Sequence, residues 1–276
     1  MSVFWRAFAA AFCCLLPASA VAGPLCPADG FDYMGTAVTF SGDRSAYYLA
    51  SDTKLVDADG APNAYHPADA PNACPDSGRG IDCLASAGYP GGSWWRTVLV
   101  ADPDDPARPA VQRDGPYKGY FVSMTSLRNT ALGADSPASY VDAARTPYLV
   151  LPAPIYRTDG MGEMGDIGWA INLDNGRSTP FVIADEGPVE PFGEASVAFW
   201  RALGGTPNPR NGDGLPDGRI AYAIFPGSGR DAAIGWPIDR DALAREAKAR
   251  LDAAGGAGAL RACAGKTSPA WEPTAQ

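Results

Sequence analysis

Two carboxylates nine residues apart, Asp185 and Glu194, are the side chains in this sequence best placed for acid–base chemistry. Asp185 ends the apolar run 181–184, and Glu194 follows a glycine at the start of a helical pattern, so both lie beside one short loop. An acid at the end of a buried strand is partly desolvated, which raises its pKa, whereas the dipole of a helix lowers the pKa of a Glu in its first turn. We therefore expect Asp185 to act as a general acid and Glu194 as the base that activates a water molecule. The reverse assignment stays open, and so do purely structural roles as a turn former and a helix-start residue.

Composition excludes several other kinds of chemistry. The chain has 276 residues and a single histidine, His66, through which any Ser/His/Asp triad or His-based zinc site would have to pass. We accordingly expect no metal and no cofactor. The formal net charge of −9 disfavours nucleic acid as a partner, because neutralising phosphates needs a surplus of Lys and Arg. A polycationic or neutral partner fits this charge better.

Further polar residues are candidates for binding a substrate. They are Asp57, Asp59, Tyr65, His66, Asp166 and Glu186. Asp57 and Asp59 alternate in an Asp-x-Asp-Gly turn, which could bind ammonium groups or Ca²⁺ or be an ordinary acidic turn. An EF-hand is disfavoured, because no Glu follows at the twelfth loop position.

The other four candidates have weaker signals. Glu186 either raises the pKa of the adjacent Asp185 by like-charge repulsion or is a solvated turn residue. Tyr65 and His66 could line a binding site, although a histidine in a surface loop is the plainer interpretation. Asp166 ends a glycine-rich turn just before an apolar run.

Apolar runs separated by turn residues predict a mainly β protein. They lie at residues 37–40, 46–49, 97–100, 119–122, 148–151, 167–171, 181–184 and 220–225. Short runs bounded by Gly, Pro, Asn and Asp are typical of strands, and Asn175-Gly176 predicts a hairpin. The later runs are continuously apolar, which indicates strands buried on both faces, as in a closed barrel.

Two helices are predicted, at residues 194–203 and 239–254. Both have an apolar stripe at helical spacing and end at a pair of glycines, and Asp239 is the expected N-cap of the second. No repeat or low-complexity linker interrupts the chain. We therefore expect one domain over residues 23–266 and a tail over residues 267–276.

The N-terminus has the layout of a secretory signal peptide. Residues 1–22 carry one positive charge at Arg6, then an apolar run, then small residues before a cleavage site after Ala20 or Ala22. Cleavage removes Arg6 and changes the net charge from −9 to −10. No later apolar run approaches the roughly 20 residues needed to span a bilayer. We expect a secreted monomer with no membrane partner after cleavage.

Four cysteines follow the signal peptide, at positions 26, 74, 83 and 263. An even number of Cys in an exported chain predicts two disulfides, for which three connectivities are possible. We favour Cys74 with Cys83, which closes a short loop, and Cys26 with Cys263, which joins the two ends of the chain. Four unpaired buried thiols are the alternative, and a zinc site is disfavoured because close Cys-x-x-Cys spacing is absent.

Several of these segments together resemble a known family. Residues 182–188, 192–198 and 225–229, with 56–62, 65–67, 122–127, 148–152 and 165–166 upstream, are similar to the chitosanases of glycoside hydrolase family 75. The resemblance covers roughly residues 46–230, and it maps the catalytic Asp of that family to Asp185 and the catalytic Glu to Glu194. Glu186 and Pro191-Phe192 depart from the family's pattern.

The resemblance implies a fold and a reaction. It implies endo-hydrolysis of β-1,4-linked glucosamine in chitosan or a related polysaccharide with inversion, for which two carboxyls stand about 6.5–9.5 Å apart. The strand, acidic turn and following helix are also similar to double-psi β-barrels. The expected fold is therefore mainly β, a closed six-stranded barrel with a few peripheral helices. Another cell-wall polysaccharide hydrolase and a non-catalytic carbohydrate-binding protein stay open as alternatives.

Overall fold

The structure is a computed structural model that describes residue 26, residues 29–71 and residues 73–265. The expected signal peptide at residues 1–22 and the expected tail at residues 267–276 lie outside the described residues. Among the helices of the described part, none has the length and apolar character needed to span a bilayer.

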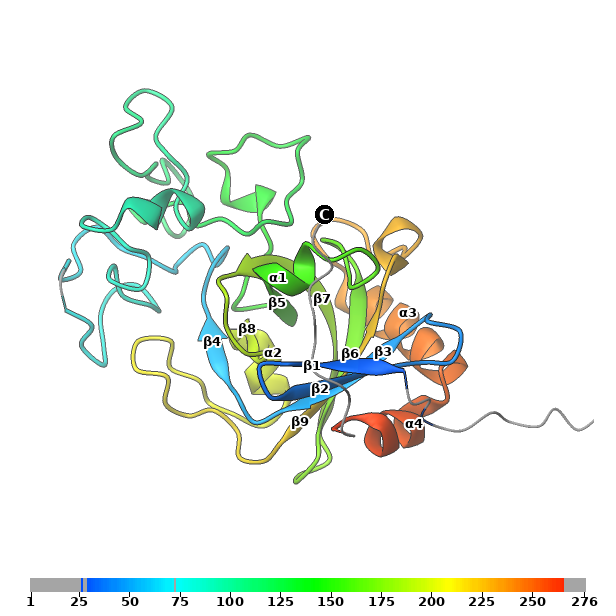
Figure 1. Ribbon diagram of the computed structural model, residues 1–276. Helices are drawn as coiled ribbons and strands as arrows, with labels where there is room; N and C mark the ends of the chain where they lie inside the picture. The colour runs from blue at the N-terminus through cyan, green and yellow to red at the C-terminus, as the bar shows by residue number, and fades with distance from the viewer. Residues whose placement is uncertain (1–25, 27–28, 72, 266–276) are drawn as a thin grey trace, which may run out of the picture.

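The described residues form one mixed sheet of nine strands (Figure 1). The strands are β1 (Gly30–Tyr33), β2 (Thr36–Phe40), β3 (Tyr47–Ser51), β4 (Leu55–Asp57), β5 (Tyr148–Pro152), β6 (Ile167–Asn172), β7 (Ser178–Gly187), β8 (Glu194–Ser196) and β9 (Ile220–Phe225). Their order is β1-β2-β3-β9-β6-β7-β5-β8-β4, so β1 and β4 are the two edges. The pairs β5–β7 and β4–β8 are parallel, and the other pairs are antiparallel. The turn at Asn175-Gly176 joins antiparallel β6 and β7, which confirms the predicted hairpin.

The expectation of a closed six-stranded barrel is wrong, because this sheet is open. Its central strands are nevertheless buried on both faces: Tyr148 and Val150 of β5 belong to one hydrophobic cluster, and Leu149 and Leu151 belong to another. A sheet covered on both faces buries alternate side chains just as a closed barrel does. The apolar runs therefore indicated burial correctly but did not distinguish the two architectures.

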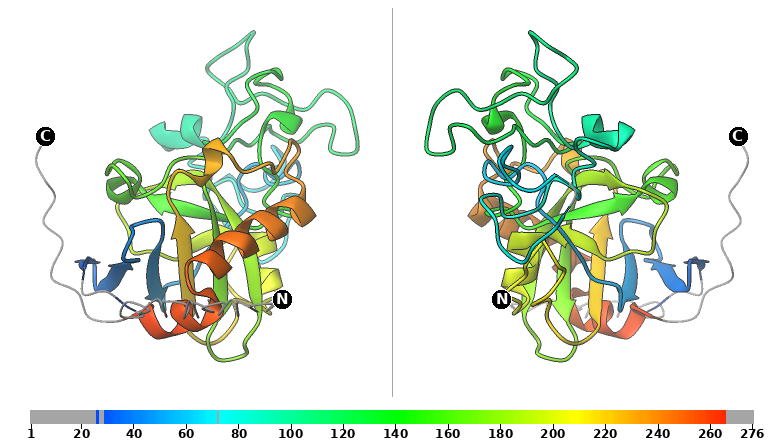
Figure 2. Two further views of the ribbon diagram at one scale, coloured as in Figure 1. Left: turned by 90° about the vertical axis from the view of Figure 1, so that its right-hand side faces the viewer. Right: turned by 90° about the vertical axis from the view of Figure 1, so that its left-hand side faces the viewer.

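Helices cover both faces of the sheet (Figure 2). They are α1 (Ala153–Tyr156), α2 (Val197–Ala202), α3 (Arg240–Ala253) and α4 (Gly256–Cys263), with a 3-10 helix, η3 (Ser228–Arg230), after β9. Helix α3 packs across β6 and β7, and α4 packs on β3 and β9. Helices α1 and α2 supply side chains to the cluster on the opposite face.

The second predicted helix is confirmed and the first is partly wrong. Asp239 caps α3 by accepting hydrogen bonds from two amides of the first turn. In the segment of the first predicted helix, however, Glu194–Ser196 form strand β8, and α2 begins only at Val197. Ser196 is the N-cap, since its Oγ accepts a hydrogen bond of 3.1 Å from the amide of Phe199. Pairing with β4 holds Glu194–Ser196, the three residues before α2, in an extended conformation.

A loop-rich lobe, residues 58–147, lies between β4 and β5 and occupies the upper left of Figure 1. Its regular structure consists of two short 3-10 helices, η1 (Ser93–Thr97) and η2 (Pro137–Ser139), and isolated bridges. The strands predicted at residues 97–100 and 119–122 are therefore wrong. Closely spaced Gly and Pro residues interrupt ladder pairing, so these runs pair only at single positions.

Two disulfides confirm the favoured connectivity. Cys26 bonds to Cys263 with their Cα atoms 5.2 Å apart, and Cys74 bonds to Cys83 with their Cα atoms 5.3 Å apart. The first joins the N-terminal end of the described chain to the end of α4, and the second closes a loop within the lobe.

Candidate active site

Asp185 and Glu194 lie on two strands that flank β5. Asp185 of β7 pairs with Val150. On the other edge of β5, Ala195 of β8 pairs with Leu149, which sets Glu194 opposite Val150. Paired residues on neighbouring strands present their side chains on one face, with about 4.8 Å between strands. The Cα atoms of Asp185 and Glu194 are therefore about 10 Å apart, on either side of Val150.

A β-bulge turns Asp185 toward this face. The partners of Leu149 and Val150 are Ile183 and Asp185, so Ala184 is the extra residue of β7. Regular pairing would have placed Asp185 on the opposite face, because side chains alternate along a strand.

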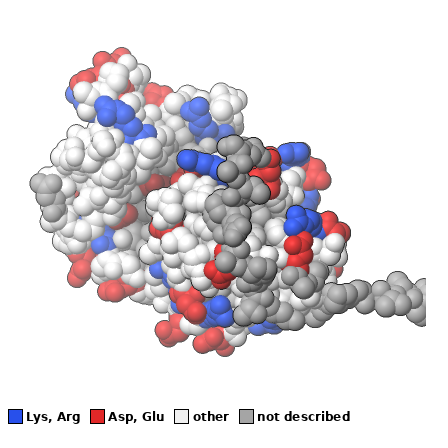
Figure 3. Space-filling model, in the orientation of Figure 1, with Lys and Arg blue, Asp and Glu red and all other residues white. Residues whose placement is uncertain are grey.

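Asp185 belongs to an acidic cluster with Asp57 and Asp59. A carboxylate oxygen of each residue lies within 4.8 Å of those of the other two. Asp57 ends the edge strand β4, and Asp59 lies in the turn after it. Two strands separate β4 from β7 in the sheet order, so the sheet must curl to bring these residues together. Figure 3 shows acidic side chains in the hollow beside the loop-rich lobe.

Hydrogen bonds orient the Asp185 carboxylate. Its Oδ1 accepts bonds from the Ser126 hydroxyl at 2.5 Å, the Ser126 amide at 3.2 Å and the Glu186 amide at 2.8 Å. The pKa of Asp185 is raised to about 7, first by burial and then by the charge of Asp57, against the opposing effect of these bonds. The nearby charge that raises this pKa thus comes from Asp57. The Glu186 carboxylate forms an ion pair with Arg157 at 2.6 Å.

The pKa of Glu194 is raised well above its ordinary value. Burial is the largest cause, followed by the charge of Asp57 and by the hydrogen bond and charge of Glu190. The expectation of a lowered pKa is wrong, because Glu194 lies in strand β8 and receives no dipole from the first turn of a helix.

Asp59 is held by one residue of the lobe and one residue of β5. The Tyr65 hydroxyl donates a hydrogen bond of 2.7 Å to its Oδ1, and the Tyr148 hydroxyl donates one of 3.0 Å to its backbone carbonyl. Burial and the charges of Asp57 and Asp185 raise the pKa of Asp59 well above its ordinary value. Tyr65, selected from the sequence, therefore lies in the site as a hydrogen-bond donor to Asp59.

Asp166 lies outside the acidic cluster and joins two turns. Its side chain is fully buried, and it accepts hydrogen bonds from the amides of Glu163 at 2.7 Å, Gly227 at 2.9 Å and Gly229 at 2.7 Å. This carboxylate joins the turn before β6 to the turn after β9.

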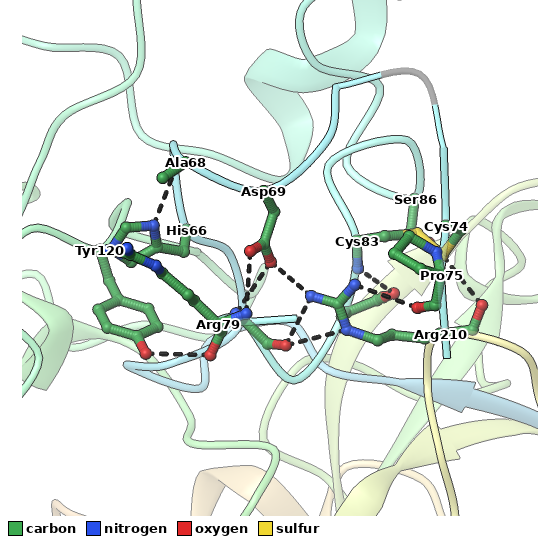
Figure 4. Close-up of polar contacts among 12 residues, drawn as sticks. His66, Ala68, Asp69, Cys74, Pro75, Arg79, Cys83, Ser86, Tyr120 and Arg210 are labelled. Atoms are coloured by element: carbon green, nitrogen blue, oxygen red, sulfur yellow. Dashed lines mark hydrogen bonds and ion pairs between the residues drawn. A yellow bond between two sulfur atoms is a disulfide. The ribbon is translucent and has the colours of Figure 1, made fainter. Parts of the chain in front are cut away.

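His66 also lies outside the acidic cluster. Its Nδ1 accepts a hydrogen bond of 3.0 Å from the Ala68 amide, and its ring packs edge-on against Tyr120 with 4.6 Å between ring centroids. Burial and the charge of Arg79 lower its pKa. These contacts hold the His66 ring against other residues of the lobe (Figure 4).

A buried ion pair anchors the disulfide loop of the lobe (Figure 4). The side chains of Arg210 and Asp69 are only 2% and 7% exposed. The Arg210 guanidinium also donates hydrogen bonds to the carbonyls of Gly80, at 2.8 and 3.0 Å, and Pro75, at 3.3 Å. One arginine thus connects the segment after α2 to the loop closed by Cys74 and Cys83.

Replacing Asp69 should destabilise the protein. The Asp69→Asn variant keeps the shape of the side chain but leaves the buried charge of Arg210 unpaired, which should lower the free energy of unfolding by about 3 kcal/mol. Urea unfolding at neutral pH measures this change. The matched control is Asp252→Asn, which breaks an exposed pair with Lys248 and should cost less than about 1 kcal/mol. Equal effects of the two variants would contradict the anchoring role.

Sequence reasoning missed three residues of the site. Ser126 and Asp82 approach it from the lobe, and Glu190 approaches it from the loop between β7 and β8. Asp82 is buried, and burial raises its pKa to about 6. Glu190 was detectable only as another acid four residues before Glu194.

The arrangement supports proton transfer by two separated carboxyls. The cluster of Asp57, Asp59 and Asp185 adds negative charge beside them, a setting that attracts cations. Ammonium groups and hard ions such as Ca²⁺ are both cations that carboxylate oxygens bind.

No protein-family model matches this chain, and no curated protein shows significant similarity to it. The resemblance to the chitosanases therefore rests on the segments quoted above.

Proposed function

We propose that this protein is an inverting glycoside hydrolase that cuts β-1,4 linkages between glucosamine units of chitosan. The observation that carries the proposal is the alignment of Asp185 and Glu194 on one face of the sheet, on either side of Val150. Inverting glycosidases hold their carboxyls about 6.5–9.5 Å apart, which leaves room for a water molecule. A Cα separation of about 10 Å allows the two carboxyls to stand within this range.

The environments of the two carboxyls favour Glu194 as the acid and Asp185 as the base. Asp185 accepts three hydrogen bonds on one oxygen, which stabilise its ionised form. Glu194 lies among carboxylates, which favour its protonated form. This is the reverse of the assignment first expected from the sequence, which rested on a helix that does not include Glu194.

In the proposed reaction, both carboxyls change protonation state. Glu194 donates its proton to the glycosidic oxygen as the bond from that oxygen to the anomeric carbon breaks. Asp185 removes a proton from the water that attacks the anomeric carbon from the opposite face. The products are two shorter sugars, a protonated Asp185 and an ionised Glu194, and exchange of protons with solvent restores both groups.

The charge of the site supports an amino sugar as substrate. Ammonium groups of chitosan are complementary to Asp57 and Asp59, which lie beside Asp185. A bound ammonium group would also lower the pKa of Asp185 and so favour the ionised base. The net charge of −9 attracts a polycation over longer range, and salt should weaken this attraction.

A comparison of two polymers tests the proposal. The purified protein should release reducing ends from soluble chitosan and none from peptidoglycan. Release from peptidoglycan alone would support a different cell-wall hydrolase. Binding to chitosan without any reducing ends would identify a carbohydrate-binding protein and overturn the proposed activity.

The Ser126→Ala variant should change the pH dependence of hydrolysis. Loss of the hydroxyl that bonds Asp185 at 2.5 Å removes a contact that lowers the pKa of Asp185. A base must be ionised, so the acidic limb of kcat/KM should move to higher pH, by about one pH unit. The control is Ser139→Ala, a buried serine of the lobe that bonds the Gly133 carbonyl. An acidic limb that stays in place in Ser126→Ala would argue against Asp185 as the base.

A further inference from the structure

Gly187, the last residue of β7, lies beneath two carboxyl groups. A methyl group added at Gly187 would lie 3.0 Å from Oε2 of Glu194 and 3.2 Å from Oε1 of Glu190. Two oxygens this close to one point are at most about 6 Å apart, and the charge of Glu190 raises the pKa of Glu194. Two ionised carboxylates this close repel each other, and a proton that one carboxyl donates to the other would relieve the repulsion.

The loop that carries Glu190 is fixed at its far end. The Ser51 hydroxyl donates a hydrogen bond of 2.5 Å to the Phe192 carbonyl, and the Leu55 amide donates one of 2.9 Å to the Gly193 carbonyl. Phe192 is also fully buried, at 1% exposed. Glu190 therefore projects from an anchored segment.

The charged groups around the pair are mostly acids. Asp57 and Asp59 act on Glu194 from β4 and the following turn, and Glu190 also raises the pKa values of Asp57 and of Tyr33 on β1. Glu190 is only half-buried, so its carboxyl reaches solvent. One proton held between the two glutamates reduces the repulsion among these carboxylates.

We propose that Glu190 is a positioning residue that shares a proton with Glu194 and keeps it in the acid form needed to protonate the leaving oxygen. This inference rests on the proposed hydrolytic function. When Glu194 gives its proton to the glycosidic oxygen, the exposed side of Glu190 takes a proton from solvent and returns it to Glu194. The pair thus regains its single shared proton after each turnover.

The Glu190→Gln variant tests the inference through the pH profile. Glutamine removes the neighbouring negative charge and can donate a hydrogen bond to ionised Glu194, and both changes lower the pKa of Glu194. Since a general acid must be protonated, the alkaline limb of kcat/KM should move to lower pH, by about one unit or more. Glu190→Asp keeps the charge on a shorter side chain and should shift the limb less. The matched control, Glu163→Gln, neutralises an exposed acid paired with Arg230 and should leave the limb in place.

A measurement without substrate separates this inference from the proposed function. In ¹³C NMR titrations of the free protein, the Glu194 carboxyl should titrate at lower pH in Glu190→Gln than in the unsubstituted protein. An identical Glu194 titration in both proteins would overturn the inference even if the protein hydrolyses chitosan. If the titrations differ as expected but chitosan is not cut, the proposed function fails and the shared proton stands.

Discussion

The Asp185→Asn and Glu194→Gln variants should each lose hydrolysis of soluble chitosan by at least about a hundredfold. General acid or base catalysis contributes about 10²–10⁴-fold to rate, and neither amide can exchange the required proton. Both substitutions keep the shape of the side chain, so polymer binding should change little. Release of reducing ends measures the first effect, and calorimetric titration with chitosan oligomers measures the second. Full activity in either variant would contradict the assignment of the pair.

A substrate with a good leaving group separates the two roles. An aryl glucosaminide whose phenolate leaves without protonation does not need a general acid. Glu194→Gln should therefore cleave this substrate much faster, relative to the wild-type protein, than it cleaves chitosan. Asp185→Asn should stay inactive on both, because the attacking water still needs a base. The opposite pattern would return the acid role to Asp185.

The protein should be at least about 4 kcal/mol less stable at pH 8 than at pH 5. Burial raises the pKa of Asp82 to about 6 and that of Asp185 to about 7, both from an ordinary value of 3.8. A buried acid with a raised pKa binds its proton more tightly in the folded state, so its stabilising effect is complete below the unfolded pKa. The effect is then lost as pH rises through about 6 for Asp82 and about 7 for Asp185, which contribute about 1 and about 3 kcal/mol over this range.

Groups with lowered pKa values do not reverse this trend. Asp43, whose pKa is lowered to about 2, and Asp69, also lowered, stay ionised in both states over this range. His66 has a lowered pKa and acts in the opposite sense, but one half-exposed histidine does not offset two buried acids.

Urea unfolding at pH 5, 6.5 and 8, with the disulfides intact, measures this dependence. Asp82→Asn should remove about 1 kcal/mol of the difference and leave the remainder. A free energy of unfolding that stays level or increases from pH 5 to pH 8 would show that these acids are ionised in the folded protein.

The central strands and one helix could be predicted because local pattern and tertiary environment agree. The apolar runs that became β6 and β9 are long enough to need burial on both faces. Asp239 caps α3 through its own first turn, a signal present in the sequence itself. Strands β4 and β8 have three residues each, and they form through pairing of β4 with β8 and of β8 with β5, which no local pattern encodes.

The sequence singled out Asp185 and Glu194, which the structure places on one face of the sheet, but their surroundings could not be predicted. The approach of Asp57 to Asp185 depends on the curl of the sheet, which brings together residues far apart in sequence. The raised pKa of Glu194 depends on a strand where the sequence predicted a helix. The contact with Glu190 depends on the missing side chain of Gly187, which is informative only once both carboxyls are placed.

The anomeric configuration of the first product tests the two-carboxylate mechanism most directly. When the protein is added to a chitosan oligomer in an NMR tube, the new reducing end should appear first as the α-anomer, because inversion at a β-linkage produces it, and then equilibrate slowly. Initial release of the β-anomer would show retention, for which the two carboxyls act at a separation of about 5 Å. That result, or the absence of any new reducing end, would contradict the account.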